Sequence, residues 1–146
     1  MKKLVLLPLI LMLSSCILVP VIDSFKKAGL TENDRKALLP PNLKKFHDSL
    51  HWGSINDAMV FVAPENASEI SDYLNETSEE QKIVESKIKS VKFDEGAYTA
   101  TVEVKTRAYK IPVYIVTDKT ERETWKCSFG NDWKLAAIVE TTTTKK

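Results

Sequence analysis

The sequence predicts an α+β fold: N-terminal short helices packed on one face of a curved antiparallel sheet of about four strands. Two observations lead to this class. Apolar residues recur at helical spacing between residues 42 and 75, whereas β-branched residues dominate from Lys82 onward. Turn residues such as Asp94-Glu95-Gly96 then separate the later segments, which is typical of an antiparallel meander lying beside helices.

The first helix is expected to begin at a cap and to end at prolines. Thr31 is followed three positions later by Asp34, the spacing of a capping box. Pro40-Pro41 should end this helix, because a proline biases the preceding residue, Leu39, away from helical angles.

Three further short helices are predicted. The segment 42–52 places Leu43, Phe46, His47 and Leu50 on one face, and Gly53 should stop it. Ser54 and Asp57 have capping-box spacing before a helix that Pro64 ends. The last helix should cover about residues 65–75, with Ile70, Tyr73 and Leu74 facing inward.

Four strands are predicted after residue 81. In the first, the apolar phase shifts between Ile88 and Val91, which indicates a bulge. The second alternates with Tyr98, Ala100, Val102 and Val104 on one face. The third should begin at Ile111 and either run to Cys127 or break near Asp118-Lys119, and the fourth begins at Trp133 after a turn at Gly130-Asn131-Asp132. Residues 141–146 form a polar tail.

The N-terminus has the pattern of an export signal. Met1-Lys2-Lys3 is followed by an apolar run and by Leu13-Ser14-Ser15-Cys16. This ending resembles the bacterial lipoprotein signal. The resemblance implies cleavage after residue 15, a diacylglyceryl thioether on Cys16 and an acyl chain such as palmitate on the new amine. The residue after the cysteine is Ile17 rather than the aspartate that retains lipoproteins at the inner membrane, so the outer membrane is expected.

Two other interpretations of this segment stay open. Leu4–Ile22 is long enough for a membrane-spanning helix, although Pro8 and Pro20 weaken a continuous one. A plain secretory signal cut nearby is the other alternative. With lipidation, residues 1–15 are the signal peptide and residues 16–30 are the lipidated cysteine and its tether.

Composition limits the partners of the mature chain. Removing the first 15 of the 146 residues takes Lys2 and Lys3 away and leaves a formal charge of one negative unit, with signs mixed along the chain. No basic face indicates nucleic acid, and none is expected as a partner. If Cys16 carries lipid, Cys127 has no disulfide partner within the chain. A buried structural thiol is then the expected role for Cys127, with a reactive thiol as the alternative.

His47 and His51 are the residues with the best spacing for a metal, at i and i+4 on one predicted helix. Asp48 stands where zinc proteases have glutamate, but no third ligand is visible. We therefore expect a packed His47 beside a surface His51. We expect neither a metal nor a cofactor.

Three segments together resemble a known superfamily. They are the Leu50-His51-Trp52-Gly53 turn, the Ala58…Phe61-Val62…Pro64-Glu65 stretch and the Trp125…Gly130…Trp133 hairpin. This pattern, between Asn42 and Val139, is similar to small bacterial lipoproteins with an NTF2-like (cystatin-like cone) domain, here over residues 31–140. The resemblance implies a cone-shaped fold shared by ketosteroid isomerase-type enzymes, dehydratases and transport factors. It assigns no catalytic residue in this chain.

The expected function is a non-catalytic binding or structural module facing the periplasm, with an envelope protein or an apolar small molecule as its partner. The alternative is a small pocket enzyme of isomerase or dehydratase type, which would need an ionisable pair inside the cone. Glu85, Glu103 and Glu121 are predicted to be solvated. The predicted inward-facing aromatic residues are Tyr73, Tyr98, Trp125 and Trp133.

Overall fold

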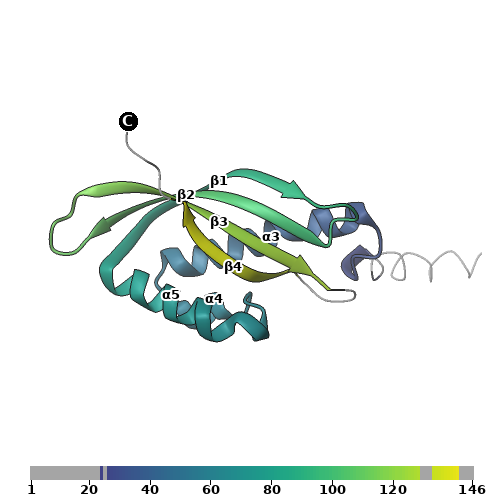
Figure 1. Ribbon diagram of the computed structural model, residues 1–146, viewed down its shortest axis with the longest axis horizontal. Coiled ribbons are helices and arrows are strands. Elements are labelled where there is room, and N and C mark those ends of the chain that lie inside the picture. Colours follow the sequence, from purple (N-terminus) through teal and green to yellow (C-terminus); the bar gives the residue numbers. More distant parts are fainter. Residues whose placement is uncertain (1–23, 25, 129–132, 142–146) are drawn as a thin grey trace, which may run out of the picture.

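The computed structural model describes residue 24 and residues 26–128 and 133–141. Helices precede strands along the chain (Figure 1): α3 (Glu32–His51), α4 (Ile55–Met59), the 3-10 turn η1 (Pro64–Asn66), α5 (Ala67–Glu80), β1 (Gln81–Phe93), β2 (Thr99–Lys110), β3 (Val116–Cys127) and β4 (Trp133–Thr141). The strands form one antiparallel sheet in the order β1-β2-β3-β4. The α+β class is thereby confirmed. Cys16, the signal segment and the Gly130-Asn131-Asp132 turn lie outside the described residues.

Helix α3 is continuous through Pro40 and Pro41, so the predicted break there was wrong. Its start was predicted correctly: the Thr31 hydroxyl accepts a hydrogen bond from the Asp34 backbone N–H, and the Asp34 carboxylate accepts one from the Thr31 N–H. Both prolines lie on the exposed side of the helix. The opposite side carries Leu39, Leu43 and Phe46, all essentially inaccessible to solvent. Burying that face on both sides of the prolines outweighs their local preference for a helix end.

Helix α5 extends to Glu80, five residues beyond the predicted end at residue 75. Ile70 and Leu74 bury its inner face as expected. At its start, α4 has Ser54 in the N-cap position, but the Ser54 hydroxyl bonds to the Asp57 carboxylate instead of to the backbone. Glu80 at the end of α5 pairs with Lys110 at 3.0 Å, which ties the helix to the end of β2.

The predicted bulge in β1 is confirmed, because the pairing with β2 shifts between Ile88 and Ser90; a second shift lies between Ile83 and Glu85. In β2, Ala100, Val102 and Val104 are buried as predicted. Tyr98 is a correction: it precedes the strand, is 44% exposed and lies against the Arg35 guanidinium, 4.0 Å from the ring centroid. It therefore belongs to the surface of the β1–β2 turn.

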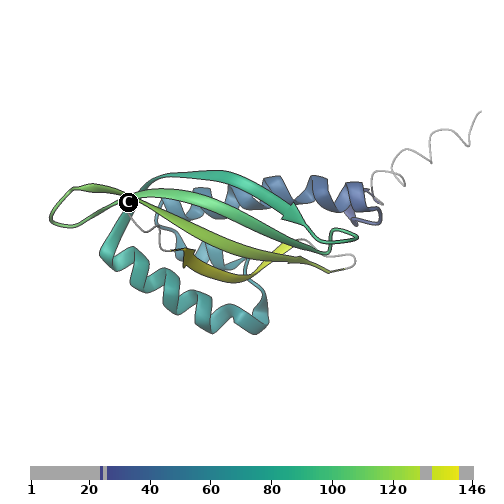
Figure 2. The ribbon, with the colours of Figure 1, turned by 45° about the horizontal axis from the view of Figure 1, so that its top comes forward.

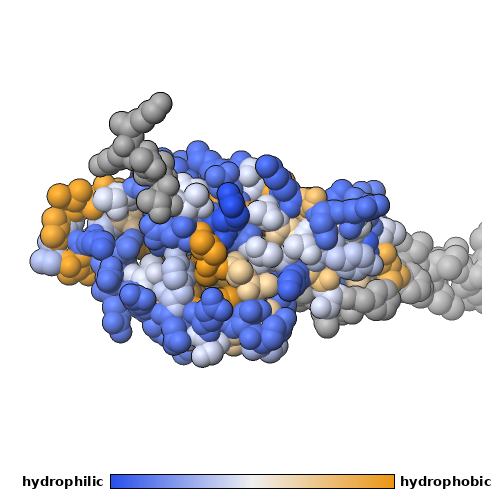
Figure 3. All heavy atoms as spheres, in the orientation of Figure 1, coloured by the Kyte–Doolittle hydropathy of each residue, from blue (hydrophilic) through white to orange (hydrophobic). Residues whose placement is uncertain are grey.

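The third strand begins at Val116, not at Ile111, and runs unbroken to Cys127. Residues 111–115 form the connection of a long β2–β3 hairpin that extends past the rest of the domain (Figures 1 and 2). Pro112 cannot donate to a strand ladder, and Tyr114 has a φ of 52°, so this stretch cannot continue the strand. Apolar side chains therefore gather at the exposed tip in Figure 3: Ile111, Val113, Tyr114, Ile115 and Val116, each more than half exposed.

The core lies between α3 and the inner face of the sheet. The Phe46 ring meets Trp125 edge-on, with centroids 5.6 Å apart, and Trp133 donates its indole N–H to the Arg35 carbonyl at 2.7 Å. Beside it, the chain after α4 joins β4: the Leu135 N–H donates to the Phe61 carbonyl at 2.7 Å. The two predicted inward tryptophans are thus the largest buried side chains of the described residues. They fix α3 over β3 and β4 and leave the other end of the sheet for a cavity.

Candidate functional site

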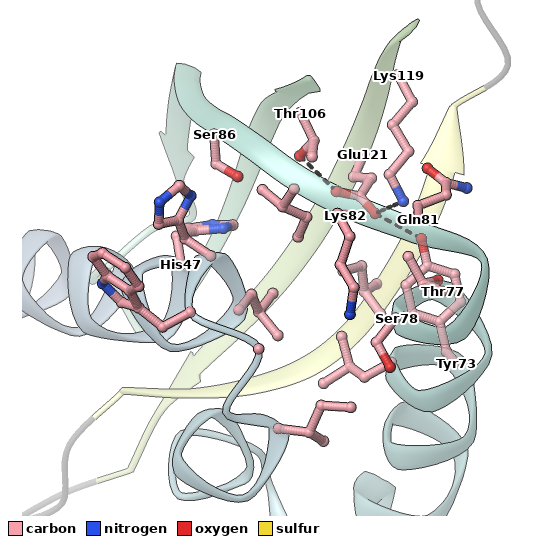
Figure 4. Close-up of a pocket in the computed structure, with 18 residues that line it drawn as sticks. His47, Tyr73, Thr77, Ser78, Gln81, Lys82, Ser86, Thr106, Lys119 and Glu121 are labelled. Carbon is pink, nitrogen blue, oxygen red and sulfur yellow. Dashed lines mark hydrogen bonds and ion pairs between the residues drawn. The ribbon is translucent and has the colours of Figure 1, made fainter. Parts of the chain in front are cut away.

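A cavity of about 290 Å³ lies between the C-terminal half of α3, helix α5 and the inner face of the sheet (Figure 4). Apolar side chains from helices and strands form part of its wall: Leu50, Ile55, Leu74, Ile83 and Ile138. The polar side chains come mostly from α5 and the strands. His47 and Ser86 lie at one end in Figure 4, and Tyr73, Glu121 and Lys119 lie at the other.

Two glutamates of β3 face the interior. Glu121 is 6% exposed and Glu123 is completely buried, so the prediction that Glu121 is solvated was wrong. Side chains alternate along a strand, and both glutamates share the parity of Trp125 and Cys127, which are buried. Following that parity back from Trp125 is the sequence signal that would have placed them inside.

Glu121 is held by three donors. Its Oε1 accepts from the Tyr73 hydroxyl at 2.6 Å and lies 2.9 Å from Lys119 Nζ, while its Oε2 accepts from the Thr106 hydroxyl at 2.9 Å. Lys119 is also largely buried and lies 5.7 Å from the centroid of the Tyr73 ring. Each carboxylate oxygen therefore has a partner from the protein itself, which is what a buried charge requires.

This network sets the ionisation of its members. Burial by itself raises the pKa of Glu121, but Lys119 and the hydrogen bonds from Tyr73, Lys119 and Thr106 outweigh burial and bring the pKa below its usual value. Burial and the neighbouring Glu121 charge raise the pKa of Tyr73 far above its usual value. Glu121 is thus an anion and Tyr73 a neutral donor at neutral pH. A saturated, stabilised carboxylate of this kind is a weak general base.

His47 forms the second charged contact. Its Nε2 lies 3.1 Å from Glu123 Oε1, and the other oxygen of Glu123 accepts the Trp125 indole N–H at 2.8 Å. The Nε2–Oε1 contact is off-axis, an ion contact rather than an aligned hydrogen bond. Burial disfavours the imidazolium, but Glu123, with smaller contributions from Glu121 and Asp48, outweighs burial and raises the pKa of His47. The imidazolium form of His47 therefore persists to higher pH than that of an ordinary histidine.

Four buried side-chain polar atoms of the described residues have no hydrogen-bond partner: His47 Nδ1, His47 Nε2, Glu123 Oε1 and Ser86 Oγ. Nε2 and Oε1 face each other in the 3.1 Å ion contact, which leaves His47 Nδ1 and Ser86 Oγ with no partner of any kind in this part of the chain, and both of these residues line the cavity. Buried polar atoms in native proteins are usually bonded to protein or to water. These two therefore mark the end where a bound molecule gains most from a polar group.

His51 also lines the cavity, but its surroundings differ from those of His47. It is exposed and meets the Trp52 ring edge-on at a centroid distance of 5.0 Å, whereas His47 is only 9% exposed. The described part of the chain contains no group of three or more His, Cys, Asp or Glu side chains arranged to hold a metal ion. The predicted packed histidine beside a surface histidine is confirmed.

The remaining predicted residues divide between core and surface. Trp125 and Trp133 are completely buried, and Cys127 is buried as expected. Tyr73 is partly buried and lines the cavity. Glu85 lies on the surface beside Lys87 at 3.0 Å, and Glu103 accepts from the Ser90 hydroxyl at 3.3 Å. Neither glutamate lines the cavity, so only Tyr73 and Glu121 of these candidates belong to the site.

No helix within the described residues is long and apolar enough to cross a membrane.

Comparisons with known proteins bear on the fold. No protein-family model matches the chain, and no curated protein matches it. Among solved structures, the chain is similar to RPA3114, a SEC-C motif containing protein from Rhodopseudomonas palustris, with 14% sequence identity and a TM-score of 0.54. The match covers 66% of this chain and 73% of RPA3114. At this identity the likeness shows a shared fold alone: helices followed by an open, four-stranded antiparallel sheet.

Proposed function

We propose that this is a lipid-anchored envelope protein whose NTF2-like domain binds a small, largely apolar molecule in the cavity between α3, α5 and the sheet. The observation that carries the proposal is the cavity itself, which has an apolar wall and a few convergent polar groups. Ligand sites usually combine these two features. At about 290 Å³ the cavity is close to the lower end of the range for small-molecule sites, so it suits a small ligand.

The charges near the cavity favour binding over catalysis at Glu121. Glu121 is matched by Lys119, and Glu123 is matched by His47. Because these contacts are made within the protein, neither glutamate needs a ligand for its charge. The ligand then gains mainly from burying apolar surface, at about 25 cal/mol per Å².

Binding is tested by displacement of an environment-sensitive apolar dye such as N-phenylnaphthylamine. Ile83→Trp places a large ring at the wall of the cavity and should abolish dye binding. Ile88→Trp is the matched control, on the same strand but away from the cavity, and should leave binding intact. Equal binding by both variants would contradict the proposed site.

The anchor part of the proposal rests on Leu13-Ser14-Ser15-Cys16. It places the mature domain on the periplasmic side, at the outer membrane, tethered through residues 16–30. The test is the mass of the N-terminal peptide of the exported protein, which should begin at Cys16 and carry acyl chains. Cys16→Ser should leave an uncleaved or soluble protein. Unchanged processing and membrane attachment would reject lipidation.

A second candidate function, a proton-transfer enzyme of isomerase or dehydratase type, is favoured by the buried His47–Glu123 contact. In that case His47 would be the general acid or base, with Glu123 holding its ring. The test is deuterium exchange at the α-carbon of a panel of enolisable carbonyl compounds in heavy water. Exchange that depends on His47 would support an enzyme, and exchange that persists in His47→Gln would reject that role.

A further inference from the structure

We propose that the cavity selects single-chain amphiphiles that end in a carboxylate, with the carboxylate held at the His47–Ser86 end. This inference rests on the proposed binding function and specifies its ligand.

Three donors at the Glu121 end are already engaged within the protein. Tyr73, Thr106 and Lys119 all direct their donors to the Glu121 carboxylate. At the other end, His47 Nδ1 and Ser86 Oγ are buried and have no partner among the described residues. They come from different elements, α3 and β1, and both line the same cavity (Figure 4). A ligand that supplies a hydrogen-bonding group here satisfies atoms that the protein leaves unsatisfied.

The chemistry of these two atoms favours an acceptor. Glu123 takes the Nε2 side of the His47 ring, so a protonated ring offers its Nδ1–H to a ligand. The Ser86 hydroxyl is a second donor. A carboxylate has two oxygens and accepts from both, whereas an ammonium group has only donors and would meet the protonated ring directly.

The charged groups around His47 also favour a negatively charged ligand. The acidic groups acting on it are Glu123 and Glu121 on β3 and Asp48 on α3. Lys119 on β3 neutralises Glu121, and Tyr73 on α5 is a neutral donor. Lys82 on β1 also lines the cavity; it is exposed to solvent and makes no ion pair within the described part of the chain. When His47 is protonated, the positive charge of Lys82 has no matching negative charge at the cavity. This excess positive charge favours an anionic ligand.

His47 can donate a hydrogen bond from Nδ1 to a ligand carboxylate only when its ring is protonated, because Glu123 occupies the Nε2 side. The imidazolium then lies between the Glu123 carboxylate and the ligand carboxylate. The raised pKa of His47 makes this form available near neutral pH. The affinity for a carboxylate should therefore fall as pH rises through the pKa of His47 in the folded protein, and the affinity for an alcohol should stay constant.

The experiment compares octanoic acid, octanol and octylamine as competitors of the dye. We expect octanoic acid to compete at a concentration roughly tenfold lower than octanol does, and octylamine to be the weakest. As pH rises from about 6.5 through the raised pKa of His47, the affinity for the acid alone should fall. A lysophospholipid of the same chain length distinguishes a free acid from a membrane lipid and should compete less well than the acid.

Three variants locate the effect. His47→Gln should lower the affinity for octanoic acid roughly tenfold and the affinity for octanol less than about threefold. Ser86→Ala should lower the affinity for the acid by a smaller factor. Lys45→Gln, at an exposed position of the same helix as His47 that does not line the cavity, is the control and should change neither. Equal competition by acid and alcohol in a protein that binds the dye would overturn the carboxylate inference alone. Failure of every compound and of the dye would overturn the proposed binding function itself.

Discussion

His47 of α3 and Glu123 of β3 meet in the interior, with Nε2 and Oε1 3.1 Å apart. The contact lies where the packed core gives way to the cavity. On the core side Glu123 accepts from Trp125, and on the cavity side His47 lines the wall. One contact thus joins the helix to the sheet and sets the charge at one end of the proposed site.

Removing His47 should destabilise the protein strongly. His47→Ala leaves the fully buried Glu123 carboxylate with Trp125 as its only hydrogen-bond donor among the described residues. Breaking a buried ion pair in this way typically costs about 3–5 kcal/mol. Urea unfolding of the variant and of His51→Ala measures the effect. His51 is exposed, so its variant should stay within about 0.5 kcal/mol of the parent. Similar losses in both would show that the contact contributes little.

The stability of the fold should depend on pH through the same histidine. The pKa of His47 is raised above 6.5 in the folded protein, so its contribution is fully present below about pH 6.5 and is lost as pH rises through the folded pKa. The free energy of unfolding should therefore decline on the alkaline side of pH 6.5. In His47→Gln this decline should disappear. Urea titrations at several pH values measure it, and a parallel decline in the variant would assign it to another group.

On the acid side, Glu121 should control stability. Its pKa is held below the usual 4.5, so its contribution is present above about pH 4.5 and is lost as pH falls through the folded pKa. Glu121→Gln should flatten this acid limb of the stability curve. A limb unchanged by the substitution would mean that Glu121 is not ionised in its buried position.

The Tyr73 hydroxyl should stabilise the fold through its bond to Glu121. Tyr73→Phe removes a 2.6 Å hydrogen bond to a charged acceptor, which is worth about 1.5–3 kcal/mol. Tyr98→Phe is a matched control, since that ring is 44% exposed and stacks on Arg35 without needing its hydroxyl. Chemical denaturation should separate the two variants, and equal stability would show that water replaces the lost donor.

Local signals in the sequence predicted much of the fold. The Thr31–Asp34 cap, the bulge after Ile88 and the buried face of β2 all depend on residues close in sequence. The break at Pro40-Pro41 was predicted wrongly for the same reason. A local rule was applied where burial of Leu39 and Phe46 against distant strands decides the outcome.

The candidate site was harder to predict than the fold. Glu121 was predicted to be solvated because it lies in a stretch whose strand phase was ambiguous from the sequence alone. Its burial depends on Tyr73 from α5 and Thr106 from β2, which only the folded chain brings together. His47 was correctly predicted to be packed, but its partner Glu123 could not be chosen before the register of β3 was known.

Arg35 should be another strong determinant of stability. Its guanidinium donates to the Gly96 carbonyl from Nε at 2.9 Å and from Nη2 at 2.6 Å, and to the Gly29 carbonyl at 2.9 Å. Lysine cannot reproduce this planar arrangement of donors, so Arg35→Lys should cost about 1–3 kcal/mol. Lys44→Ala, at an exposed position on the same helix, should cost less than about 0.5 kcal/mol. An unchanged free energy of unfolding in Arg35→Lys would show that the β1–β2 turn holds its place without these bonds.

Replacing one proline in α3 should stabilise the protein. Pro41 lies on the exposed side of a continuous helix, where proline is about 3 kcal/mol less favourable than alanine. Alanine restores the missing N–H donor and relieves the clash with the preceding turn, although it also adds about 1 kcal/mol of freedom to the unfolded chain. Pro41→Ala should therefore raise the free energy of unfolding by about 1–2 kcal/mol. Lys45→Ala, another exposed position of α3, is the control and should change stability little. A loss of stability in Pro41→Ala would mean that the path of the helix through both prolines is needed to seat Leu39 and Phe46 on the sheet.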